Sequence, residues 1–148
     1  MIRARRSPAA IPSTRRSPRN RSAGPVRRES AHDMEIYERA AGSVMIFALR
    51  GRLTLESFGQ LKQRVRNLVE QGGRQLVVDL SGVSYVDSIG VAELVRSHVI
   101  MGNHDGRLVL AAIPPQVEQL LAVTRLDQIF DRHHTQADAI EKLTRADI

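Results

Sequence analysis

The stretch Gln75–Val99, QLVVDLSGVSYVDSIGVAELVRSHV, decides the fold of this 148-residue chain. Its beginning, Gln75–Leu80, is aliphatic and β-branched, which is typical of a buried strand. Farther along, apolar residues recur at helical spacing, and the turn-forming run Gly102–Gly106 ends the pattern. A strand that leads into a helix is the repeating unit of α/β folds. The residues expected to face inward from this helix are Val91, Leu94, Val95 and Val99.

The same alternation of strand and helix continues on both sides of this stretch. Before it, two apolar runs predict strands, and helical spacing ended by a Gly-Gly pair predicts the first helix. After it, a third clear strand is followed by a Pro-Pro pair, which suits the start of a helix. The predicted strands are Glu35–Arg39, Ser43–Leu49, Arg107–Ile113 and Ile129–Phe130, and the predicted helices cover residues 58–69, 115–121 and Thr135–Leu143.

These elements predict an α/β domain over residues 34–148. The first two strands are separated by too few residues for a crossover helix, so we expect an antiparallel hairpin. The remaining strands are each followed by a helix, which favours parallel pairing. We therefore expect one mixed sheet of four or five strands with about four helices.

The positive charge of the chain is concentrated in residues 1–33. They hold nine arginines against Glu29 and Asp33, a net charge of +7, whereas residues 34–148 hold 13 basic and 14 acidic residues, a net charge of −1. With so little to bury, residues 1–33 are expected to be disordered. Three interpretations stay open: an organellar targeting peptide, a basic arm for a polyanion, or upstream sequence with Met34 as the true start.

Composition excludes several classes of function for the domain. The absence of cysteine removes disulfides and thiolate chemistry, and suits a cytoplasmic protein. No apolar run approaches the roughly 20 residues of a membrane span, so we expect no membrane partner. A domain with almost no net charge has no basic surplus for phosphates, so direct DNA binding is not expected.

No catalytic or cofactor site is predicted. Asp79 and Asp87 are the one carboxylate pair that could be considered for acid–base chemistry, but no further group is spaced to assist them. His133 and His134 are adjacent and therefore point in different directions, which makes a poor metal pair. Glycine-rich phosphate-binding motifs are absent, so no nucleotide cofactor is expected.

The turn Asp87–Gly90 carries the one candidate modification site. Ser88 stands where an N-cap belongs, and on spacing alone a capping serine, worth about 1 kcal/mol, is the commoner interpretation. The alternative is that Ser88 accepts a phosphoryl group of up to about two negative charges. A helix N-terminus tolerates such an anion, and the neighbouring Asp87 would make the modified surface strongly acidic, so that a partner fitted to neutral serine is rejected.

Three segments in this order resemble a STAS domain of the bacterial anti-sigma factor antagonist type. VVDLSGVSYVDSIGVAELV, residues 77–95, resembles the family signature in which Asp-Ser-x-Gly begins a helix. LRGRLTLESFGQLKQRV, residues 49–65, is similar to its first block, and RLVLAAIPPQVEQLLAVTRLDQIF, residues 107–130, to its last. The resemblance covers the whole of the predicted domain and leaves out residues 1–33.

The resemblance implies partner switching. The unmodified antagonist binds an anti-sigma factor, often a serine kinase, and so releases a sigma factor; the kinase then phosphorylates the antagonist, and a phosphatase reverses the modification. Ser88 falls on the phosphoacceptor, and Asp87 and Gly90 match their places in the motif. Two positions depart: Ile89 replaces a small or hydroxyl residue, and Thr54, placed to cap the first helix, replaces an aspartate.

We therefore expect Asp87, Ser88, Ile89, Gly90 and Thr54 to form the partner-binding surface, with a side chain at Gly90 approaching the partner. The alternative within the same family is a scaffold subunit of a stress-signalling or lipid-transport assembly, in which Ser88 is only structural.

Overall fold

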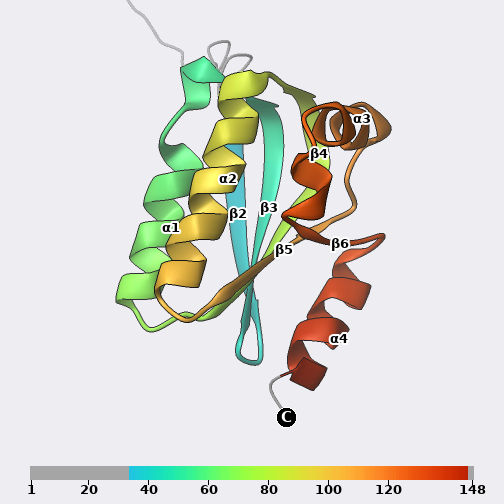
Figure 1. The fold of residues 1–148 in the computed structure, drawn as a ribbon. Helices are drawn as coiled ribbons and strands as arrows, with labels where there is room; N and C mark the ends of the chain where they lie inside the picture. Colours follow the sequence, from blue (N-terminus) through green and yellow to red (C-terminus); the bar gives the residue numbers. More distant parts are fainter. Residues whose placement is uncertain (1–33, 147–148) are drawn as a thin grey trace, which may run out of the picture. The chain divides into compact units, whose positions relative to one another are not determined.

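Residues 34–146 are described by a computed structural model of the chain (Figure 1). The disorder predicted for residues 1–33 lies outside the described residues. The strands are β2 (Met34–Ala41), β3 (Val44–Leu53), β4 (Gln75–Val86), β5 (Arg107–Ala111) and β6 (Asp131–His133). The helices are α1 (Gln60–Glu70), α2 (Ser88–Asn103), α3 (Pro115–Val123) and α4 (Gln136–Ala146), with 3-10 turns η3 (Leu55–Ser57) and η4 (Leu126–Gln128).

The strands form one five-stranded sheet in the order β2-β3-β4-β5-β6. β2 and β3 pair antiparallel, whereas β3, β4, β5 and β6 pair in parallel. The hairpin turns at Gly42, whose φ of 64° lies in the left-handed region that glycine adopts without strain. The mixed α/β sheet and the antiparallel hairpin predicted from the sequence are confirmed.

Helices cover both faces of this sheet (Figure 1). Side chains alternate along β4, so Leu76, Val78 and Leu80 enter the larger core, which includes Leu61 of α1 and Leu94 of α2. Between them, Val77 joins a smaller core beneath α4. This burial on two faces explains the almost continuous aliphatic runs of the parallel strands.

Three boundaries differ from the sequence prediction. β4 continues to Val86, because its last residues pair with the end of β3, Val86 opposite Leu53. The last strand is Asp131–His133, whereas Phe130 is a buried core residue whose ring meets His98 edge-on. Phe58 precedes α1 and is 43% exposed, so it does not belong to the inward stripe of the first helix.

The pairing of β3 with β4 positions the candidate site. β3 and β4 run in the same direction and end opposite each other. The residues that follow Leu53 and Val86 therefore meet at the carboxyl ends of these strands. Thr54 and Asp87 are these residues, and α2 begins directly after Asp87. Within residues 34–146, no helix is long and apolar enough to cross a membrane.

Candidate functional site

Asp87, and not Ser88, is the N-cap of α2. Its backbone is extended, with φ −104° and ψ −176°, and its Oδ1 accepts a hydrogen bond of 2.9 Å from the Gly90 N–H. Ser88 is the first residue of the helix itself. The prediction of a capping serine is therefore wrong by one residue: β4 ends at Val86, which leaves Asp87 as the extended residue that precedes the helix, and aspartate caps as well as serine.

Ser88 presents a free hydroxyl on the surface. The side chain is exposed, and its oxygen makes no hydrogen bond with any other residue that the structure describes. The backbone N–H groups of Ser88 and Ile89 also have no acceptor among residues 34–146, as is usual in the first turn of a helix. The hydroxyl therefore lies at the positive end of the α2 dipole and is not needed to hold the helix in place.

Gly90 is buried against the end of β3. A Cβ atom at this position would lie 2.0 Å from the carbonyl oxygen and 2.7 Å from the carbonyl carbon of Leu53. The same Leu53 oxygen accepts a hydrogen bond of 3.3 Å from the Asp87 N–H. The expectation that a side chain at Gly90 would approach a partner is therefore wrong: this glycine allows α2 to pack directly on the backbone of β3.

Thr54 is also withdrawn from the surface. It is 5% exposed, its Oγ1 accepts a hydrogen bond of 3.2 Å from the Glu56 N–H, and its own N–H donates to Ser57 Oγ at 3.0 Å. This reciprocal arrangement is a capping box. Thr54 thus caps η3 and not α1, and its hydroxyl is engaged within the turn. Of the five residues expected at the partner surface, Ser88 and Ile89 are exposed, Asp87 is half-buried, and Thr54 and Gly90 lie beneath them.

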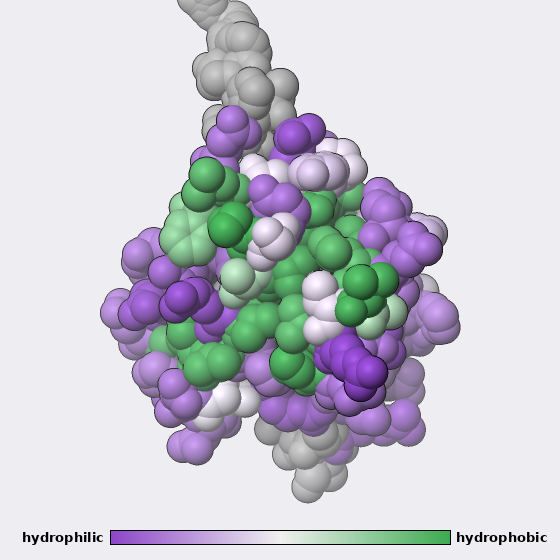
Figure 2. Space-filling view, turned by 45° about the horizontal axis from the view of Figure 1, so that its top comes forward, coloured by the Kyte–Doolittle hydropathy of each residue, from purple (hydrophilic) through white to green (hydrophobic). Residues whose placement is uncertain are grey.

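An apolar groove begins at Ser88 and runs between α2 and α3. Its volume is about 490 Å³. Figure 2, in which the upper end of the molecule comes forward, shows a broad apolar area bordered by hydrophilic residues. Of the residues expected to face inward from α2, Val95 is half-buried and lines the groove, and Val99 is 48% exposed. The lining residues are Ser88, Val91, Ala92, Val95, Arg96, Leu120, Thr124 and Leu126.

Glu93 connects α2 to α1 and was missed by the sequence analysis. It is fully buried, and its Oε2 accepts hydrogen bonds from the N–H groups of Gly59 and Lys62, at 2.9 and 3.0 Å. No side chain of its own segment caps α1, so a carboxylate from the neighbouring helix takes that role. The sequence holds one signal for this burial: Glu93 stands next to Leu94, which is predicted to face inward from α2.

The other ionisable candidates are occupied by local contacts. Asp79 accepts hydrogen bonds from the Ser81 N–H at 2.8 Å and from the Gln136 side chain at 2.6 Å, so it connects β4 to α4. His133 and His134 line a small hollow of about 290 Å³ beside α3. Among residues 34–146, no three His, Cys, Asp or Glu side chains are grouped so that they could hold a metal ion.

A family model and a sequence relative match this chain. A family model described as "Mlab, STAS domain" matches residues 36–131. A STAS-domain containing protein of Pseudomonas aeruginosa (strain UCBPP-PA14) is 36% identical over 59 residues, which are 38% of this chain and 56% of that protein. The match thus spans little more than half the length of that relative.

Solved structures share the fold at low sequence identity. A putative anti-sigma factor antagonist of Thermotoga maritima has a TM-score of 0.68 at 23% identity, covering 72% of this chain and 92% of its own. An anti-sigma factor antagonist of Mycobacterium paratuberculosis has a TM-score of 0.68 at 22% identity, covering 75% and 94%. The phosphorylated form of the Bacillus cell fate determinant SpoIIAA has a TM-score of 0.60 at 17% identity, covering 74% and 99%.

Proposed function

This chain belongs to the STAS domain family, and we propose that it acts as an anti-sigma factor antagonist whose binding is ended by phosphorylation of Ser88. In this function the exposed beginning of α2 docks on an anti-sigma factor and so releases a sigma factor. The observation that carries the proposal is the free hydroxyl of Ser88, which stands beside Asp87 but takes no part in capping the helix. The protein itself is proposed to be a binding module and not an enzyme.

Phosphorylation at Ser88 is compatible with the fold. The cap of α2 is made by Asp87, so modifying the neighbouring hydroxyl breaks no hydrogen bond within residues 34–146. The N–H groups of Ser88 and Ile89 have no backbone acceptor there and point along the positive end of the helix dipole, which stabilises an anion. The modified domain is therefore expected to stay folded and to change only its surface.

The same modification would repel a partner that fits the neutral surface. Ser88 lies at the end of the apolar groove, between the half-buried carboxylate of Asp87 and the exposed side chain of Ile89. A phosphate there adds up to about two negative charges beside an existing one. Placing this charge against apolar or acidic groups of a partner costs several kcal/mol, which is enough to end binding.

The chemistry of the switch would be supplied by the partners. The Ser88 oxygen attacks the γ-phosphorus of ATP held by a serine kinase, the bond from that phosphorus to the β,γ-bridging oxygen breaks, and ADP leaves. The hydroxyl proton passes to a base of the kinase. A phosphatase restores the serine by transferring the phosphoryl group to water. The contribution of this chain is an accessible nucleophile at a fixed place on a rigid helix.

Two substitutions test the switch. Ser88→Asp should stay folded but bind the anti-sigma factor at least about tenfold more weakly, a change of about 1.4 kcal/mol. Ser88→Ala should bind as the native protein does and become insensitive to ATP. Asn103→Asp, which adds the same charge at the other end of α2, is the matched control and should keep native affinity. Calorimetric titration with and without ATP, and mass spectrometry of the Ser88 peptide, measure these effects.

If Ser88→Asp binds as tightly as the native chain, or no phosphate reaches Ser88 in the presence of kinase and ATP, the switch is wrong. The second candidate would then take its place: an unmodified STAS subunit of a larger assembly. The two departures from the antagonist pattern, Thr54 and Ile89, favour that candidate. It predicts that a partner binds equally well with native Ser88, alanine or aspartate at this position.

A further inference from the structure

β2 leaves one edge of the sheet open. It is the first strand in the order of the sheet, and among residues 34–146 it pairs only with β3. An open edge presents unpaired N–H and C=O groups, and natural proteins usually block it with proline, lysine, a bulge or a very short strand. β2 is eight residues long, MEIYERAA, contains neither proline nor lysine, and pairs with β3 without interruption from Met34 to Ala41. The edge is therefore suited to receive another strand.

The charged residues of β2 oppose pairing with most other strands. Their order along β2, however, favours pairing with a second copy of the same strand. Glu35, Tyr37 and Arg39 are every second residue of the strand, so their side chains lie on the same face of the sheet. In an antiparallel pair of two identical strands centred on Tyr37, residue 35 of each strand faces residue 39 of the other. Each Glu35 then lies opposite the partner's Arg39, and the two tyrosine rings meet between these ion pairs.

We propose that this protein forms a two-fold symmetric dimer in which β2 pairs antiparallel with β2 of a second copy, with Tyr37 opposite the partner's Tyr37. The occupant of the edge is a second copy because the strand is complementary to itself in this register. Moving the centre to Ile36 or Glu38 would place Tyr37 opposite Glu35 or Arg39 of the second copy. Glu35, which already faces Arg50 of β3, and Arg39 would then find no opposite charge across the new pair. The charges thus select one register, as register is normally selected in sheets.

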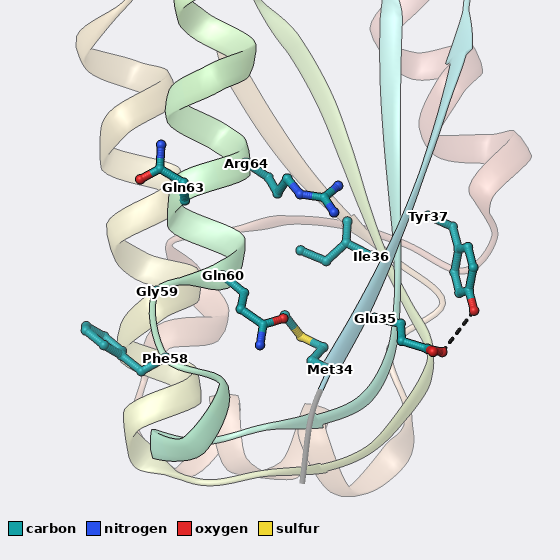
Figure 3. Close-up of a pocket in the computed structure, with 9 residues that line it drawn as sticks. All are labelled: Met34, Glu35, Ile36, Tyr37, Phe58, Gly59, Gln60, Gln63 and Arg64. Atoms are coloured by element: carbon teal, nitrogen blue, oxygen red, sulfur yellow. Dashed lines mark hydrogen bonds between the residues drawn. The ribbon is translucent and has the colours of Figure 1, made fainter. Parts of the chain in front are cut away.

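The side chains on this face are able to make the exchange. Tyr37 is half exposed, and its hydroxyl donates a hydrogen bond of 2.9 Å to Glu35, so the two lie together on the side away from α1 (Figure 3). Arg39 donates to the side-chain oxygen of Gln136 on the surface. In the dimer Arg39 would exchange this neutral amide for the partner's carboxylate, which gives the stronger charge-assisted hydrogen bond.

The opposite face of β2 also gains cover. Met34 and Ile36 point toward α1, beside an open groove of about 820 Å³ between β2 and that helix (Figure 3). In the proposed register Glu38 would lie opposite the partner's Ile36. Its charge is already paired with Arg64 at 2.5 Å, so no unpaired carboxylate is placed against the apolar side chain. A second sheet edge beside this groove would cover Ile36, which is half-buried in the monomer.

A charge-exchange experiment on the full chain tests the dimer. Glu35→Arg and Arg39→Glu each place like charges opposite each other twice per dimer, so each variant alone should associate at least about tenfold more weakly than the native chain. An equimolar mixture of the two should dimerise again, because arginines at 35 and 39 of one chain then face glutamates of the other. Glu70→Arg, at the exposed end of α1, is the control for net charge. Sedimentation velocity at several concentrations, in about 150 mM salt, measures association.

A cysteine variant gives an independent measurement. The chain contains no cysteine, so Tyr37→Cys introduces a single thiol at the proposed two-fold axis, where opposite Cβ atoms of paired strands come within disulfide reach. Oxidation should convert this variant to a covalent dimer much faster than it converts Thr144→Cys, whose thiol would lie on the exposed side of α4. A native chain that stays monomeric up to about 1 mM, the range of very weak binding, would overturn the proposal. So would a mixture of the two charge variants that associates no better than either alone while both stay folded.

Discussion

Gly90→Ala is the substitution for which the structure gives the sharpest expectation. The added methyl carbon would lie 2.0 Å from the carbonyl oxygen of Leu53, whereas real contacts of this kind are not shorter than 3.0 Å. Relief requires the first turn of α2 and the end of β3 to separate by about 1 Å or more. That movement strains the hydrogen bond of 3.3 Å between the Asp87 N–H and the Leu53 oxygen.

The size of the effect follows from opposing contributions. Overpacking against a backbone that cannot rotate away costs about 3 kcal/mol or more, and weakening one backbone hydrogen bond costs about 1 kcal/mol. Alanine is the better helix former by about 1 kcal/mol, which offsets part of this loss. Gly90→Ala should therefore lower the free energy of unfolding by about 2–4 kcal/mol. Gly102→Ala is the matched control: it lies in the same helix, where an added Cβ meets nothing within 4 Å, so it should raise stability by up to about 1 kcal/mol.

Urea unfolding followed by circular dichroism measures both variants. The two midpoints should move in opposite directions from that of the native chain, with unchanged slopes, because the surface exposed on unfolding stays the same. If Gly90→Ala is as stable as Gly102→Ala, then α2 does not pack on the Leu53 carbonyl, and the described geometry at the candidate site is wrong.

Three further outcomes are expected. Glu93→Ala removes the acceptor for two N–H groups at the start of α1 and should lower the free energy of unfolding by about 2–4 kcal/mol in urea titrations. Glu93→Gln should lower it less, because the amide oxygen still accepts a hydrogen bond. Equal losses of stability in the two variants would contradict this role. Asp87→Ala should cost about 1 kcal/mol of stability and Ser88→Ala less than about half of that, and the reverse ranking would make the serine the cap. The pKa of Tyr37 lies above its usual value because its hydroxyl donates a hydrogen bond to Glu35. The contribution of this bond to stability is therefore present below the ordinary tyrosine pKa and is lost as the pH rises from that value through the raised pKa of the folded protein. Ultraviolet titration should show a lower Tyr37 pKa in Glu35→Gln, and an unchanged one would contradict this cause.

The sheet could be predicted from the sequence because its cause is local. Aliphatic runs such as Gln75–Leu80 and Arg107–Ala111 are needed where a strand is buried on both faces, and few other structures require them. The short connection at Gly42 likewise leaves room only for a hairpin. The order of these elements was sufficient to indicate the α/β class and the location of the turn that leads into α2.

The details of the site depend on contacts that the sequence does not display. Asp87 and Ser88 are equally good caps, and the choice between them is decided by where β4 ends, which depends on the pairing of Val86 with Leu53 in another strand. The role of Gly90 depends on the same distant carbonyl. Glu93 resembles any polar helix residue until α1 is seen to begin beside it. Each error of the sequence analysis at the site thus arises from packing between segments far apart in the chain.

The shift of the cap from Ser88 to Asp87 strengthens the case for a switch. A serine that capped α2 would have its oxygen committed to the helix, and phosphorylation would have to break that bond before a partner could respond. Here the helix is fixed by Asp87 and by the contact of Gly90 with β3, both of which lie beneath or beside the hydroxyl. In the proposed switch, the serine would therefore carry or lose a phosphate while the backbone around it stays in place. A rigid support with one variable charge is what a partner needs if it is to read the modification alone.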